Sequence, residues 1–171
     1  MDREWQDVFR RRMHRFEERH TKNGGIAVSI KIRVSSGCFH REHSPEAFAV
    51  IDRKIRGVSN ADFDYVEHES GPELLVYLAV GTAGLTLAKS LIDLTTTIIK
   101  ARSEGIKKGD NPSEPLELIV RRSDERNGFK EDVVLRIGHT DPVNEKVIEA
   151  RLKESLDKLN QKKSTNRSSR E

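Results

Sequence analysis

The chain has 171 residues, of which 35% are hydrophobic and 35% are charged. This length suits one domain with short extensions, and it is long enough to bury a real core. The 31 basic and 28 acidic residues leave a net charge of +3, which is weak evidence about partners. The single cysteine, Cys38, excludes an intramolecular disulfide, and no apolar signal follows the charged N-terminus. We therefore expect a cytoplasmic protein.

A helix is predicted over residues 3–20, because apolar side chains recur there at helical spacing. They form one stripe: Trp5, Val8, Phe9, Met13 and Phe16. Asn23-Gly24-Gly25 ends this helix, so residues 1–24 are treated as an amphipathic segment before the main domain of residues 25–160. The stripe is expected to pack on that domain or on a second copy, or to dock on a partner.

The main domain opens with a strand, a helix and a second strand. Residues 26–34 are the clearest strand, since five apolar residues alternate there with other residue types. The helix is expected to begin with Ser44 as its N-cap and Pro45 at its first position, and to end near Gly57. Residues 62–67 read as the second strand.

The most apolar segment of the chain, Leu74 to Ile99, carries only two charges, Lys89 and Asp93. These two are spaced i,i+4 and can pair on one helix face. Because Gly71-Pro72 breaks the preceding strand, we predict one long helix over about residues 73–104. A helix that is apolar nearly all round must be buried in a core, in a partner or in a membrane. Small residues predict a close helix contact along it: Gly81, Ala83, Gly84 and Ala88.

Burial of this helix in protein is favoured over a membrane span. The uncharged run Leu74–Ala88 is shorter than the roughly 17–20 residues that a span needs. Extending it to Ile99 brings Lys89 and Asp93 into the bilayer, where each charge costs about 2.5–3.5 kcal/mol. A membrane-associated component anchored by residues 74–99 is kept as an alternative.

A hairpin and a last helix complete the domain. Strands at residues 116–120 and 133–137 flank Asn127-Gly128, a dipeptide typical of two-residue type I′ turns. Such a turn places Val120 opposite Leu135, and a looser loop over residues 123–131 is the alternative.

The last helix is expected to begin with Asp141 as its cap and Pro142 at its first position. One apolar stripe lines it: Val147, Ile148, Leu152, Leu156 and Leu159. Residues 161–171 are basic and lack apolar side chains, so a disordered tail is predicted. The whole order is α-β-α-β-α-β-β-α, an α+β fold with a single small mixed sheet of about four strands, packed by the central helix and flanking helices.

From Gly25 to about Leu159 the chain resembles a small bacterial family, effector-associated constant component 1. The segments that carry the resemblance are the opening GIAVSIKIRVSS and SPEAFAVIDRKIRGV, the apolar SGPELLVYLAVGTAGLTLAKSLIDLTTTIIKAR, and the closing PLELIVRR, DVVLRIG and DPVNEKVIEARLKESLDKL. The resemblance implies a non-enzymatic component of prokaryotic conflict or defence systems that acts by contacting other proteins. It implies no functional residue at a particular position.

Three residues with metal-binding side chains lie close together in one loop: Cys38, His40 and His43. Thiolate and imidazole are ligands that zinc prefers, but a structural zinc site needs four of them. His68 or His139 would complete the set only in a favourable fold. We therefore expect no metal and no other cofactor.

Enzyme activity is not expected either. His139 with Asp141, and His68 with Glu67 and Glu69, are adjacent carboxyl and imidazole groups of the kind that general acid–base catalysis uses. Adjacency in sequence does not create the pocket that tunes such groups. No nucleophile motif such as G-x-S-x-G is present, and no small-molecule substrate is indicated.

The sequence therefore favours a non-enzymatic protein-interaction module, an adaptor that acts by oligomerisation or partner docking. Its contact surface would be the N-terminal stripe or the surplus apolar surface of the central helix. The main alternative is a basic accessory protein that binds nucleic acid without reading its sequence, through phosphate contacts that salt weakens. Two basic clusters would make these contacts: Arg10, Arg11, Arg12 and Arg15 near the start, and Lys158, Lys162, Lys163 and Arg167 near the end.

Overall fold

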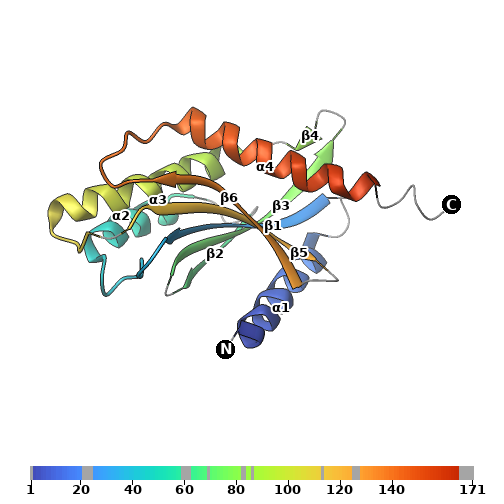
Figure 1. Ribbon diagram of the computed structural model, residues 1–171, viewed down its shortest axis with the longest axis horizontal. Coiled ribbons are helices and arrows are strands. Elements are labelled where there is room, and N and C mark those ends of the chain that lie inside the picture. The colour runs from blue at the N-terminus through green and yellow to red at the C-terminus, as the bar shows by residue number, and fades with distance from the viewer. Residues whose placement is uncertain are drawn as a thin grey trace.

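The structure is a computed structural model, and its α+β architecture is shown in Figure 1. It describes residues 2–20, 25–58, 63–68, 70–81, 84–85, 87–112, 114–124 and 128–165. The helices of this part of the chain are α1 (Asp2–His20), α2 (Pro45–Arg56), α3 (Lys89–Lys108) and α4 (Glu145–Thr165). The strands are β1 (Gly25–Val34), β2 (Phe63–His68), β3 (Gly71–Gly81), β4 (Gly84–Leu85), β5 (Leu116–Asp124) and β6 (Gly128–Ile137).

The strands form one sheet in the order β2-β3-β1-β5-β6, and the short β4 pairs with β3. Every pairing of the described strands is antiparallel, so the prediction of a mixed sheet of about four strands is wrong in both respects. The α+β class itself is confirmed. Strand β1 is central, which explains why both of its faces are buried along almost its whole length.

The main core lies between one face of the sheet and the helices α2, α3 and α4 (Figure 1). Along β1 the even-numbered residues from Ile26 to Val34 point into it, in line with the alternation in the sequence. Ile51 of α2, Ile98 of α3 and Leu152 of α4 meet them, and all three are fully buried. This core therefore holds most of the apolar burial that stabilises the domain.

The predicted central helix over residues 73–104 is wrong. Gly71-Pro72 begins strand β3 rather than a helix, and the helix of this region, α3, begins only at Lys89. Strand β3 lies between β1 and β2 with both faces covered, so its apolar residues run on without alternation. Such a run cannot be told from a buried helix by its periodicity. The predicted pair of Lys89 with Asp93 is confirmed, at 3.1 Å.

The close helix contact predicted at small residues is also wrong for the three that the structure describes. Gly81 pairs with Gly84 where β3 meets β4, and Ala88 is an exposed residue just before α3. Ala83 lies outside the described residues. No helix in the described ranges is long and apolar enough to cross a membrane.

The predicted hairpin is confirmed, but its register is not. Leu135 lies opposite Leu118, whereas the two-residue turn places it opposite Val120. A shift of two residues keeps each side chain on the same face, so the hydrophobic pattern could not reveal it. Pairing continues to Asp124 opposite Gly128, which rules out both the tight turn and the open loop over residues 123–131. A bulge after Leu118 shifts the register once more.

The ends of the helices differ from the prediction in their capping groups. Ser44 precedes α2 as expected, but its side chain makes no cap hydrogen bond. Instead the carboxylate of Asp110 accepts hydrogen bonds from the backbone N–H groups of Glu46 and Ala47, at 3.2 and 3.1 Å. Asp110 follows α3, so this cap ties two helices together.

Helix α4 begins at Glu145, not at Pro142. The Asn144 side chain accepts a hydrogen bond from the backbone N–H of Lys146, whereas Asp141 accepts one from Gly138. The helix continues to Thr165, so the predicted disordered tail from residue 161 is helical in its first residues. Residues 166–171 lie outside the described part.

Candidate interaction surface

Helix α1 lies on the face of the sheet opposite to α4, where it contacts β1, β3 and β6 (Figure 1). Its stripe is buried, since Phe9, Met13 and Phe16 each expose no more than 4% of their surface. Together with the sheet these side chains form a second, smaller core, separate from the main one. On the sheet its members are two buried residues and two partly buried rings, here called the docking patch: Ala27, Leu75, Tyr77 and Phe129.

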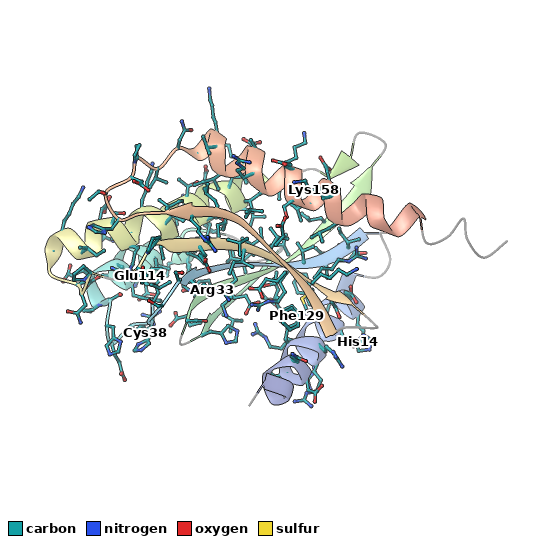
Figure 2. The ribbon with its side chains drawn as sticks, viewed as in Figure 1. His14, Arg33, Cys38, Glu114, Phe129 and Lys158 are labelled. Carbon is teal, nitrogen blue, oxygen red and sulfur yellow. The ribbon has the colours of Figure 1, made fainter. Side chains whose placement is uncertain are left out.

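Aromatic contacts orient α1 on this patch. The rings of Phe9 and Phe129 meet edge to face, with their centroids 6.3 Å apart. The guanidinium of Arg121 lies 5.2 Å from the centre of the Phe9 ring and 5.4 Å from that of Phe129. A cation within about 6 Å of an aromatic face is attracted to it. Phe129 lies beside α1 in Figure 2.

Polar contacts with β2 flank the apolar stripe. Arg19, near the end of α1, forms an ion pair with Asp64. Two turns earlier in the helix, Nη1 of Arg12 lies 3.4 Å from Nε2 of His68. Exposed ion pairs contribute little to stability, so the contact between Arg19 and Asp64 orients the helix more than it holds it.

Next to the docking patch the same face of the sheet carries a buried carboxylate, Glu73 of β3. Its side chain is 0% exposed, accepts a hydrogen bond from the hydroxyl of Ser29, and lies 2.6 Å from His68 and 3.3 Å from Arg121. Burial alone would raise the pKa of Glu73. The contacts with His68 and Ser29 and the charge of Arg121 outweigh it and lower the pKa to about 2.

A second carboxylate, Glu117 of β5, continues this charged network. It accepts hydrogen bonds from Nε of Arg33 at 3.0 Å and from Nε of Arg136 at 2.8 Å. Both partners lower the pKa of Glu117 against the opposing effect of burial. Glu131 links the two halves of the network, since it lies 3.2 Å from Arg33 and 3.4 Å from Arg121.

Lys31 of β1 lies on the same face and is only 8% exposed. Burial lowers the pKa of its ammonium group, and the neighbouring Arg121 lowers it further, while Glu73 acts in the opposite direction. Lysine is rarely buried on a solvated sheet surface. Lys31 beside three carboxylates that bind arginines therefore shows that this face carries a buried charged network.

The residues of this network were missed by the sequence analysis. The sequence places Glu73 in a helix, and it gives Lys31 and Arg33 no role beyond alternating with the apolar residues of the first strand. The available signal was a glutamate within an otherwise apolar run, which marks a polar contact inside the fold. Its partners could not be found, because Ser29, His68 and Arg121 come from three other strands.

The structure describes the side chains of only some residues of the predicted interaction stripe. Phe9, Met13 and Phe16 pack on the docking patch of their own chain, which is one of the arrangements that the sequence left open. Val8 points away from the patch and is 41% exposed. The side chain of Trp5 lies outside the described part.

The two basic clusters are placed in part: the first lies on α1, and Lys158 of the second lies on α4, on the opposite side of the sheet (Figure 1). Arg10 is 3.8 Å from Asp7, and Lys158 is 2.7 Å from Glu154, so each faces an acidic neighbour on its own helix. Arg11 and Arg15 are exposed. No side-chain placement is described for Lys162, Lys163 and Arg167.

Of the adjacent imidazole and carboxyl groups noted in the sequence, Glu69 lies outside the described residues. His68 contacts Glu73 rather than Glu67, whose carboxylate binds Arg41. His139 and Asp141 lie at a cavity of about 490 Å³ between α3 and the loop that precedes α4. Both residues are exposed there.

Comparisons of the chain with protein-family models, curated proteins and solved structures find no match.

Proposed function

We propose that this chain is a non-enzymatic protein-interaction module that recognises an amphipathic helix on its docking patch. The observation that supports this most directly is the seating of α1, whose three apolar side chains are buried on the sheet face. A helix that lays its apolar stripe on a complementary surface is a recurrent mode of protein recognition. The charged network beside the patch supplies the polar rim.

The occupant to which we commit is α1 of a second copy. That helix carries the same stripe and the same flanking arginines, so it matches the docking patch without further adaptation. Exchange of an identical element between protomers is a low-cost route to a dimer. The main core lies on the other face of the sheet and does not include α1, so the exchange leaves it intact.

The proposal is tested with two neighbouring apolar residues of α1. Phe9 is buried on the patch, and Val8 is exposed, so Phe9→Asp removes the docked helix whereas Val8→Asp is a matched control. Light scattering of the full chain across a concentration series should show dimers for the unmodified chain and for V8D, and monomers for F9D. A chain that remains monomeric at every concentration contradicts the exchange of α1.

The patch itself is tested in a second experiment with the full-length F9D chain. Its own helix no longer competes, so a fluorescent peptide of residues 2–20 should bind to the open patch. The same peptide with Phe9→Asp should bind about 100-fold more weakly or worse, because truncating a buried phenylalanine contact costs about 3–5 kcal/mol. Equal binding of the two peptides would show that the patch does not recognise the stripe.

The place of such a module in a prokaryotic defence system is a further part of the proposal. It rests only on the resemblance to effector-associated constant component 1.

A further inference from the structure

The loop between β1 and α2 brings together three metal-binding side chains: Cys38, His40 and His43. One donor atom from each, a thiol sulfur or an imidazole nitrogen, lies within 4.8 Å of the other two. Cys38 and His40 are partly buried and His43 is exposed, so the cluster is open to solvent on one side. Cys38 and Phe129 of the docking patch lie well apart in Figure 2.

Neighbouring residues of the same loop hold it in place. Phe39 is fully buried against Phe48, with their ring centroids 5.4 Å apart. Ser44 is 1% exposed, and its backbone N–H donates to the carbonyl of His40 at 2.9 Å. Gly37 has a φ of +115°, which allows the chain to turn into the loop.

Arg41 is the third anchor. Its guanidinium binds both carboxylate oxygens of Asp52 on α2, at 2.7 and 2.5 Å, and both of Glu67 on β2, at 2.8 and 2.7 Å. Two bidentate ion pairs tie the loop to two different elements and balance the charge of Arg41. Cys38, His40 and His43 are therefore presented from a braced loop.

We propose that Cys38, His40 and His43 bind a divalent transition metal of the zinc class. Sulfur and imidazole ligands select such metals over magnesium and calcium. Three protein ligands with one position left to water are typical of open zinc sites, so binding does not require a fourth ligand among the described residues. Binding releases the thiol proton of Cys38 to solvent and replaces it with a metal–sulfur bond.

The distances within the cluster are compatible with metal binding. Sγ of Cys38 lies 2.5 Å from Nδ1 of His43, and the rings of His40 and His43 are 4.3 Å apart at their centroids. Ligands on one tetrahedral zinc are separated by about 3.5 Å, given bond lengths of about 2.0–2.3 Å. Side-chain rotations that move the donor atoms by about 1 Å would therefore admit the ion, with the backbone unchanged.

The test is a titration of the full, untagged chain with Co²⁺, with Cys38 kept reduced by a non-chelating phosphine. We expect one equivalent to bind, with a sulfur-to-cobalt charge-transfer band and the visible bands of a tetrahedral site, all lost on addition of Zn²⁺. Cys38→Ser should abolish the charge-transfer band, and His40→Ala should weaken binding by about 10- to 100-fold or more. His14→Ala, an exposed histidine on α1, is the matched control and should change nothing.

Arg41→Ala separates a braced site from adventitious binding, because it removes an anchor but no ligand. A built site should lose affinity in this variant, and zinc should raise the melting temperature of the native chain but not that of C38S. Absence of the charge-transfer band, or binding by C38S and H40A as tight as that of the native chain, would overturn the proposal. So would binding that Arg41→Ala leaves unchanged, since this identifies adventitious metal only.

Discussion

Glu73 shows how one residue can be costly to bury and still support the fold. Its carboxylate is fully enclosed, and only hydrogen bonds and charges from other strands keep it ionised. Removing one partner of such a group leaves a buried charge unpaired. This costs more free energy than breaking a surface ion pair. The residue therefore links β3 to β1, β2 and β5 through its contacts with Ser29, His68 and Arg121.

This gives a prediction for stability against pH. The pKa of Glu73 is lowered from 4.5 to about 2 in the fold, so its ionised form stabilises the folded state above pH 4.5. That contribution, about 3 kcal/mol, is lost as the pH falls from 4.5 towards 2. Urea unfolding should therefore find Glu73→Gln markedly less stable than the native chain near neutral pH, with the difference shrinking in acid. A difference that does not change with pH would contradict this role.

At the scale of elements, the sequence predicted most helices and strands and misassigned one long segment. The opening helix, β1, α2 and β2 follow from periodicity and turn residues, because the apolar residues of each recur at the period of its own secondary structure. Strand β3 was misread because its neighbours β1 and β2 and the helices above and below bury it on both faces. The residues that decide its environment, such as Ala27 and Ile30 of β1, are distant in sequence.

The cap of α2 provides a prediction at the same scale. Asp110 accepts two hydrogen bonds at the N-terminus of α2, and Ser44 accepts none there, although the sequence favours Ser44. Asp110→Ala should lower the free energy of unfolding by about 1–2 kcal/mol, whereas Ser44→Ala should change it by less than about 0.5 kcal/mol. Chemical denaturation of both variants decides between the two caps. A larger loss for Ser44→Ala would show that the serine is the functional cap.

At the scale of the whole molecule, the two faces of the sheet are covered unequally. Helices α2, α3 and α4 pack on the main core, whereas α1 packs on the small second core next to a charged network. Segments with few buried apolar contacts open at lower free energy than the global fold. The uneven cover therefore makes α1 the element most easily released.

Hydrogen exchange of the full chain tests this unevenness. Helices α1 and α3 have similar lengths, 19 and 20 residues, so they form an internal comparison. Amides of α1 should exchange faster than those of α3, and amides of β1, which lies between β3 and β5, should be the slowest. Equal protection of α1 and α3 would mean that α1 belongs to the same cooperative unit as the main core, which would weaken the exchange of α1 between copies.

The sequence by itself determined the α+β class, the amphipathic first helix, the alternation of β1, the existence of the last hairpin and the Lys89–Asp93 pair. These features depend on neighbours within a few residues, where periodicity and turn chemistry act directly. Only the tertiary structure decided that residues 71–81 form a strand, that Asp110 caps α2, and that Glu73 meets Ser29, His68 and Arg121. Each of these depends on which strands lie side by side, and long-range pairing leaves no local signature in the chain.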